Sequence, residues 1–119
     1  MFFFDTYALI EIAIGNQKYR PYLDFPYVIT ALNFGEFYAY LIRTYGIEVA
    51  KERLYSYNFE MLELAKEVMM TTTEFKTKHT KKEFSWADCA GYISAQKLRL
   101  KFLTGDPEFN GMPNVEFVK

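Results

Sequence analysis

Four carboxylates occur in this chain where the neighbouring residues are mostly apolar. Asp5 follows the run FFF, and Asp106 follows the run FLTG. Glu36 is the only charged residue in ALNFGEFYAYLI, and Asp88 lies near the start of SWADCAGYISA. A buried carboxylate is costly unless it is paired with a cation or coordinates one. These four acids are therefore the first candidates for chemistry.

The chemistry that such acids favour is metal-assisted hydrolysis. Carboxylates that converge on one place raise one another's pKa values, and a divalent cation relieves their repulsion. Oxygen ligands with no histidine nearby in the sequence favour Mg²⁺ or Mn²⁺ over Zn²⁺. One such ion can hold a phosphodiester and activate a water, and a second ion would act on the other side of an in-line displacement. The sequence leaves the number of ions open.

The elements that must position these acids are predicted from apolar runs and helical spacing. We expect strands at residues 2–5, 27–30, 102–104 and 115–118. We expect helices at residues 6–14, 31–45, 59–70 and 85–98. A further helix is expected after Gly46, with Ile47, Ala50, Leu54 and Tyr57 at helical spacing. Residues 18–26 are expected to be irregular, and the polar, lysine-rich residues 71–84 are expected to form a loop. The pattern leaves open whether residues 56–61 form a further short strand.

This order of elements predicts an α/β fold with a mainly parallel sheet. Residues 1–119 have the length of one domain with one core. Ligands of parallel sheets bind in the crevice beyond the carboxyl ends of the strands. Asp5 and Asp106 each follow a predicted strand, so they would face one crevice if those two strands are neighbours.

Three of the four acids also have a simple structural explanation. Ser85 and Asp88 have the spacing of a helix capping box, and Asp106-Pro107 suits a turn. Asp5 can cap the helix that follows it. Glu36 is the hardest to explain in this way, because no lysine or arginine lies one helical turn away on either side.

Composition restricts the function classes. The formal net charge is −1, so binding to a polyanion requires a local basic patch or a metal ion. The single cysteine, Cys89, excludes an intramolecular disulfide and a cysteine-rich zinc site. The apolar N-terminus lacks the basic start of a signal peptide, and no stretch approaches the roughly 18 uncharged apolar residues of a membrane span. We therefore expect a soluble, cytoplasmic protein that does not enter a membrane.

Four stretches resemble the PIN-domain family, and in particular the small VapC-like toxin nucleases of toxin–antitoxin pairs. They are FFFDTYAL, the acid within ITALNFGEF, the predicted helix SWADCAGYISA and the C-terminal stretch FLTGDPEFNGMPNVEF. The last is the strongest, because the family commonly ends with a strand, a T-x-D turn, a phenylalanine and a valine-rich strand. The resemblance covers nearly the whole chain and implies a three-layer α/β/α PIN-like fold with a mainly parallel central sheet flanked by helices.

The resemblance also implies an activity and partners. It implies an endoribonuclease that depends on Mg²⁺ or Mn²⁺ and hydrolyses RNA phosphodiester bonds, with a cognate antitoxin protein as partner and a homodimer formed through the two middle helices. The acids expected to bind the metal and to be catalytic are Asp5, Glu36, Asp88 and Asp106. Thr6 and Thr104 match polar positions beside the acids and are expected to orient ligands or water. The segment from Tyr55 to Thr73 departs from the family, because it lacks the clear strand expected there.

Other residues near these motifs have competing interpretations. Lys76, Lys78, Lys81 and Lys82 form the densest basic run, which suits either an RNA backbone contact or a solvated loop. Glu108 either substitutes for Asp106 or has no role. Cys89 is expected in the core, and Trp86 in the core or an interface. His79 is not expected to act as a general base, because a metal-activated water does not need one.

Two rival functions remain from the sequence. The first is a PIN-fold module with an inactive site, which binds protein or RNA without cutting it. The second is a signalling domain of receiver type, which also gathers acids at strand ends. A receiver would require paired acids after the first strand and a lysine after a late one, and neither is present beside Asp5 or in FLTGDPEF.

Overall fold

A computed structural model describes the whole chain, residues 1–119. The elements occur in the order β1 (Phe2–Phe4), α1 (Thr6–Ala13), the 3-10 helix η1 (Gln17–Tyr22), β2 (Tyr27–Thr30), α2 (Ala31–Tyr45), α3 (Ile47–Tyr55), β3 (Phe59–Leu62), α4 (Lys66–Lys78), α5 (Trp86–Lys97), β4 (Lys101–Thr104), the 3-10 helix η2 (Pro107–Phe109) and β5 (Val115–Phe117). None of the helices is both long and apolar enough to cross a bilayer.

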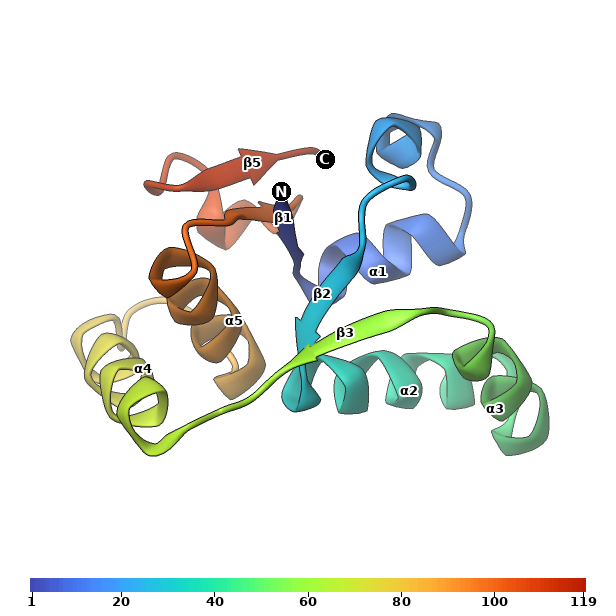
Figure 1. Ribbon diagram of the computed structural model, residues 1–119, viewed down its shortest axis with the longest axis horizontal. Coiled ribbons are helices and arrows are strands. Elements are labelled where there is room, and N and C mark those ends of the chain that lie inside the picture. Colours follow the sequence, from blue (N-terminus) through green and yellow to red (C-terminus); the bar gives the residue numbers. More distant parts are fainter.

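The centre of the molecule is one five-stranded sheet in the order β3-β2-β1-β4-β5, with every neighbouring pair parallel (Figure 1). The first strand therefore occupies the middle position, where Phe3 pairs with Val28 on one side and with Phe102 on the other. The predicted α/β fold with a mainly parallel sheet is confirmed. The adjacency of β1 and β4 also meets the condition for Asp5 and Asp106 to share one crevice.

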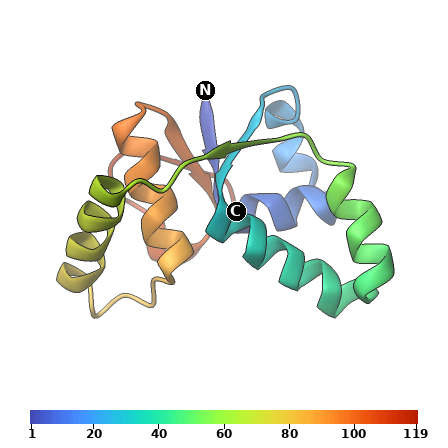
Figure 2. The ribbon, with the colours of Figure 1, turned by 60° about the horizontal axis from the view of Figure 1, so that its bottom comes forward.

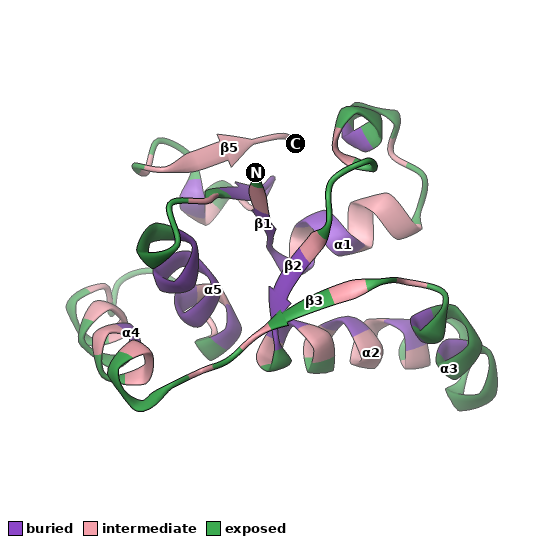
Figure 3. Cartoon of the chain, in the orientation of Figure 1, coloured by how far each residue is buried: buried purple, intermediate pink, exposed green.

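Helices cover both faces of the sheet, which makes three layers. Figures 1 and 2 show α1, α2 and α3 grouped on one side and α4 and α5 on the other. Neighbouring residues of β1 point to opposite faces: Phe4 packs with Leu9 and Phe37, whereas Phe3 packs with Phe102 and residues of α5. Both faces of the central strands are buried, as Figure 3 shows for β1 and β2.

Helix α5 lies unusually close to the sheet. Eight residues of α5 are buried, Ala87 and residues 89–95, and most of them are small. A Cβ atom added at Gly91 would lie 2.7 Å from the ring of Phe3 and 3.2 Å from that of Phe102. Glycine is therefore required where the helix crosses β1 and β4, and this packing fixes the position of the first turn of α5, which carries Asp88.

The region between α3 and α5 differs from the sequence prediction. The predicted helix at 59–70 is wrong for residues 59–65, because residues 59–62 form β3, which pairs along its whole length with β2. Its last residues, 66–70, are the start of α4. This strand also supplies what the sequence lacked between Tyr55 and Thr73. The predicted loop at 71–84 is wrong for residues 71–78, which complete α4. Val68 and Phe75 of α4 lie seven residues apart on one face and pack against the core beneath α5, so the polar residues between them remain helical.

The prediction of irregular structure at 18–26 is wrong for its first part. Residues Gln17–Tyr22 form a 3-10 helix that includes Pro21. Asn16 caps it by accepting a hydrogen bond from the backbone N–H of Lys18 at 3.0 Å. Tyr19 within this helix is fully buried, and its hydroxyl donates to the carbonyl of Val118. The segment is therefore bonded to the C-terminal end of the chain.

Candidate active site

The four predicted acids lie near the carboxyl ends of the strands, and we call them the acidic cluster: Asp5, Glu36, Asp88 and Asp106. Asp5 directly follows β1, and Asp106 lies two residues beyond β4. Glu36 lies in α2, which begins where β2 ends, and Asp88 lies in the first turn of α5. Packing of α2 against both α1 and α5 closes the group.

Asp5 is the most deeply placed acid of the cluster, with 1% of its surface exposed. The hydroxyl of Thr104, the last residue of β4, donates to Asp5 Oδ2 at 2.7 Å. The same hydroxyl accepts a hydrogen bond from the backbone N–H of Asp106 at 3.1 Å. Asp5 Oδ1 is buried and has no hydrogen-bond partner, and the side chain does not cap α1. The capping explanation for Asp5 is therefore wrong, and Oδ1 of this buried carboxylate is left without a hydrogen-bond partner.

Glu36 is held by a chain of hydrogen bonds that starts at the end of β2. Thr30 and Asn33 form a capping box at the start of α2. The amide nitrogen Nδ2 of Asn33 donates to Thr6 Oγ1 at 3.1 Å, and Thr6 Oγ1 donates to Glu36 Oε1 at 2.7 Å. Glu36 is half-buried, so this network orients it at the rim of the crevice.

Asp88 and Asp106 each cap a helix, and each also belongs to the acidic cluster. The backbone N–H of Ser85 donates to Asp88 Oδ2 at 2.8 Å, and Asp88 N–H donates to Ser85 Oγ at 3.0 Å, which completes the predicted capping box. Asp106 Oδ1 accepts from the backbone N–H of Glu108 at 3.0 Å and so caps η2. Both roles use one oxygen of the carboxylate, so neither explanation excludes a second role.

The electrostatics of the site show that the acids act on one another. Burial raises the pKa of Asp5 well above 3.8, and the neighbouring Asp88 carboxylate raises it further. Burial raises the pKa of Asp88 to about 6, with the charges of Glu36 and Asp106 adding to the effect and the Ser85 N–H opposing it. Without a cation, the site therefore retains protons that isolated carboxyl groups would lose.

The fit of this site to a divalent cation rests on its donor chemistry. The cluster consists of oxygen donors, and the orphaned Oδ1 of Asp5 is an available ligand atom inside it. As the side chains stand, no group of three or more His, Cys, Asp or Glu residues is close enough to hold a metal ion. Mg²⁺ commonly binds through one or two carboxylates and keeps several waters, so a closed cage is not required. The cluster therefore offers the oxygen donors that such an ion prefers.

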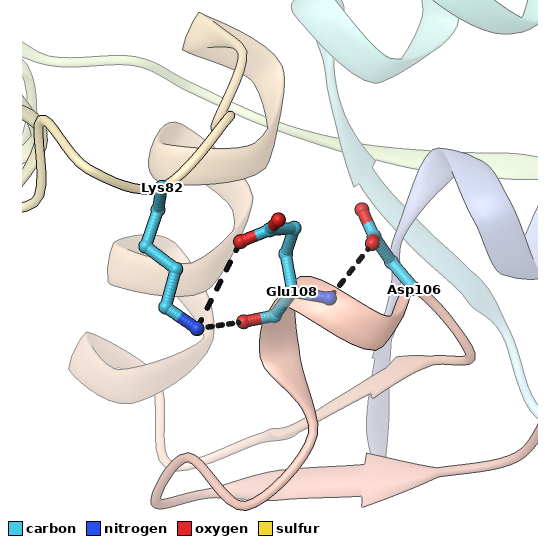
Figure 4. A network of polar contacts seen from close by, with 3 residues as sticks. All are labelled: Lys82, Asp106 and Glu108. Carbon is cyan, nitrogen blue, oxygen red and sulfur yellow. Dashed lines mark hydrogen bonds and ion pairs between the residues drawn. The ribbon is translucent and has the colours of Figure 1, made fainter.

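The basic run and Glu108 lie beside the cluster. Lys82 Nζ donates to the carbonyl of Glu108 at 2.8 Å and lies 3.8 Å from its carboxylate, while the Glu108 N–H holds Asp106 (Figure 4). Lys76 Nζ donates to the carbonyl of Phe84 at 2.7 Å. Lys78 and Lys81 are exposed. Lys76 and Lys82 thus tie down the segment before α5 and η2, whereas the other two project into solvent.

Three other residues named from the sequence are also placed. Cys89 is buried in the core, as expected. Nδ1 of His79, the C-cap residue that follows α4, donates to the carbonyl of Phe75 at 2.8 Å. Trp86 is 47% exposed, so of its two expected places the core is wrong and an interface stays a prediction. Sequence reasoning gave no role to Arg43, which lines a hollow together with Thr6 and Glu36; its separation of seven residues from Glu36 is the signal that puts both on one helix face.

Comparisons with known proteins were made at three levels. No protein-family model matches the chain. No curated protein sequence matches it either. Solved structures do match: VapC20 of Mycobacterium tuberculosis, described as a toxin that cleaves the sarcin–ricin loop, superposes with a TM-score of 0.78 at 18% identity over 100% of both chains. A toxin–antitoxin complex from Klebsiella pneumoniae contains a chain that matches with a TM-score of 0.75 at 18% identity, over 97% of this chain and 95% of that one.

The agreement with these structures extends over essentially the full length of each chain. It includes the five-stranded parallel sheet and the helices on both faces. At 18% identity, the likeness establishes architecture. This chain therefore has the PIN-like α/β fold of VapC-type toxins.

Proposed function

We propose that this protein is a Mg²⁺- or Mn²⁺-dependent endoribonuclease and the toxin of a type II toxin–antitoxin pair. The observation that supports the proposal is that four carboxylates near the strand ends influence one another's charge, and that Asp5 has a buried, unpartnered oxygen. Such a group is unfavourable for stability in the absence of a cation, and perturbed acids of this kind concentrate at functional sites.

The chain's own residues would prepare the site. Thr104 orients Asp5, and Thr6 orients Glu36, so neither carboxylate has to be ordered when a ligand binds. Asp5, Glu36, Asp88 and Asp106 would hold the ion. When bound, a divalent ion supplies neutralisation of phosphate charge and activation of water. Because Asp5 and Asp88 have raised pKa values, ion binding should displace protons and weaken as pH falls.

RNA is the proposed substrate because VapC20, which shares the fold, is described as cleaving an RNA loop. An antitoxin is the proposed partner because the second matching structure is a toxin–antitoxin complex. We also propose cytoplasmic action and a homodimer through α2 and α3, where Tyr45 is 36% exposed and Tyr55 is 83% exposed. Light scattering that gives a monomer mass at high protein concentration would refute the homodimer.

A second candidate function is favoured by one observation. Because no three acids are close enough to hold an ion as they stand, the chain can also be read as an inactive PIN-fold module that binds RNA or protein without cutting. The two candidates differ in metal binding. The enzyme must bind a divalent ion through the acidic cluster, and the inactive module need not.

The deciding experiment is a calorimetric titration of Mn²⁺ into the wild-type protein and into Asp88→Asn. The matched control is Asp24→Asn, which removes an exposed carboxylate just before β2, at the opposite end of the strands. We expect saturable binding by the wild type and the control, and loss of binding in Asp88→Asn. No binding by the wild type would favour the inactive module.

Activity provides the second test. Expression of the wild type should arrest growth, and Asp5→Asn should relieve the arrest at equal protein level. Purified protein should cleave structured RNA only with added Mg²⁺ or Mn²⁺. Cleavage that persists in excess chelator would refute the metal-dependent mechanism, while leaving the nuclease assignment in place.

A further inference from the structure

One hollow outside the acidic cluster has a chemistry that the proposed mechanism does not use. It lies between the end of α4 and the start of α5 and has a volume of about 430 Å³. Its lining consists of Thr73, Lys76, Thr77, His79, Thr80, Lys82 and Trp86. We call it the tryptophan hollow. Trp86 is its only hydrophobic lining residue, and the remaining side chains are hydrogen-bonding or cationic.

The tryptophan hollow differs in charge from every other hollow on the protein. The other four each contain a carboxylate: Glu74, Asp24, Glu63 and Glu36, respectively. The tryptophan hollow contains two lysines and no acid. In a chain of net charge −1, this makes the hollow locally basic, with the Glu108 carboxylate 3.8 Å from Lys82 Nζ outside its lining.

Trp86 presents an aromatic surface within this basic setting. It is the only tryptophan of the chain, and 47% of its surface is exposed. The ammonium of Lys76 lies 5.4 Å from the centre of its ring, where it is also bonded to the carbonyl of Phe84. A cation beside an exposed aromatic ring is the combination that binds single-stranded nucleic acids, with the ring stacking on a base and the cation facing the backbone.

We propose that the tryptophan hollow binds one unpaired nucleotide of an RNA, with the base stacked on Trp86 and the backbone facing Lys82 and Lys76. The assignment of the ligand as RNA rests on the proposed function. Threonine hydroxyls and the His79 ring supply hydrogen-bonding groups around the base and sugar. A protein segment fits less well, because docking of a peptide would require more apolar surface than one side chain.

The hollow and the acidic cluster both include a residue of the first turn of α5. Trp86 stands two residues before Asp88 on the first turn of α5. Lys82 is bonded to Glu108, whose N–H holds Asp106 (Figure 4). A nucleotide held on Trp86 would therefore lie at the same helix start as Asp88, one of the acids proposed to hold the metal. This placement makes Trp86 a positioning residue that favours substrates with an unpaired base beside the cut.

The test uses binding without cleavage. The probe is a fluorescently labelled 2′-O-methyl single-stranded oligoribonucleotide of mixed sequence, in buffer with chelator, and the control probe is a duplex of the same sequence. Binding is followed by anisotropy of the label and, with unlabelled probe, by the fluorescence of the single tryptophan. The variants are Trp86→Ala, Trp86→Phe and, as matched control, Tyr55→Ala, which removes an aromatic side chain that is 83% exposed on α3.

Stacking predicts a specific pattern. The single strand should quench Trp86 and the duplex should not. Trp86→Ala should weaken single-strand binding roughly 5- to 140-fold, because base–aromatic stacking contributes about 1–3 kcal/mol per base. Trp86→Phe should retain most of the affinity, and Tyr55→Ala should bind like the wild type. Lys82→Gln should lower the slope of log affinity against log salt by about 0.7.

Several results would overturn the proposal. Absence of quenching in the wild type at saturating probe does so without any variant, so a folding defect of Trp86→Ala cannot mask the answer. Equal affinity of Trp86→Ala and the wild type for the single strand also overturns the proposal. Tryptophan fluorescence that changes with protein concentration and not with the probe would overturn it too, because it would assign the hollow to a contact between protein molecules. Quenching without RNA cleavage in Mn²⁺ would refute the proposed nuclease and keep the stacking site. Cleavage without quenching would refute the stacking site and keep the proposed nuclease.

Discussion

Replacement of Asp88 by asparagine should stabilise the metal-free protein at neutral pH, although it removes a residue of the acidic cluster and of a capping box. The reason is that the carboxylate at this position is ionised at a cost. Burial and the charges of Glu36 and Asp106 raise its pKa to about 6, from an ordinary value of 3.8. Asparagine has no charge and keeps a side-chain oxygen that can accept the hydrogen bond from Ser85 N–H.

The magnitude follows from the linkage between pKa and stability. A carboxyl whose pKa rises from 3.8 to about 6 on folding makes the folded, ionised state less stable by about 3 kcal/mol at neutral pH. Asp88 is only partly buried, so solvent screening reduces this to about 2 kcal/mol. The opposing contribution of the Ser85 N–H is already included in the pKa. For a domain of this size, the gain corresponds to roughly 6 to 10 °C in melting temperature.

The effect must depend on pH in one direction. Between pH 4 and pH 6 the folded wild type binds more protons at Asp88 than the unfolded chain does, so its stability falls as pH rises through this range. Asparagine does not titrate. The advantage of Asp88→Asn over the wild type should therefore be near zero below pH 4, grow up to pH 6, and remain constant above pH 7.

The assay is chemical denaturation followed by circular dichroism in excess chelator, at steps of pH from 4 to 8. Asp24→Asn is the control, and its difference from the wild type should show no comparable rise in this range. Added Mn²⁺ should reverse the order, because it stabilises the wild type by about 2.7 kcal/mol at a concentration 100 times Kd and the variant by less. An Asp88→Asn protein that is less stable than the wild type at pH 7.5 without metal would refute the reasoning and leave Asp88 as a helix cap only.

Thr104→Val removes the hydroxyl that donates to Asp5 and accepts from the N–H of Asp106, so denaturation should show a loss of about 1–3 kcal/mol relative to Thr104→Ser. Gly105→Ala would place a Cβ against the Val118 carbonyl and the Tyr7 ring and should destabilise by about 1–3 kcal/mol, whereas Gly35→Ala, with nothing within 4 Å, should stabilise α2 by about 0.5–1 kcal/mol; thermal melts of the pair check the contrast. Asp5→Asn should abolish RNA cleavage while the far-ultraviolet dichroism stays that of the wild type; a partly unfolded spectrum would instead assign Asp5 a structural role.

Elements with strong local signals were predictable from sequence. The helix at 31–45 has a capping residue in Thr30 and a stop at Gly46, and the helix after Ser85 has a complete capping box. The strands around Phe3 and Phe102 are continuous apolar runs. These signals act between residues a few positions apart, so they are present in the sequence itself. They also predict that Asp5 and Asp106 each follow a strand.

The missed elements depend on distant partners. Residues 59–62 form a strand because β2 lies beside them, and the middle of that strand, Glu60 and Met61, is exposed, so its own pattern carries little signal. The polar end of α4 is helical because Phe75 reaches the core under α5. In each case the packing or pairing of the element is supplied by residues far away in sequence.

The sequence by itself determined the four carboxylates, their places after apolar runs and the class of fold. Only the tertiary structure decided that β1 lies between β2 and β4, which brings Asp5, Thr104 and Asp106 into hydrogen-bonded contact. It also decided that one oxygen of Asp5 stays buried without a partner and that Trp86 stays exposed beside Lys76. The physical reason is that strand order, burial and electrostatic coupling are properties of residues brought together across the chain, which spacing along the sequence does not specify.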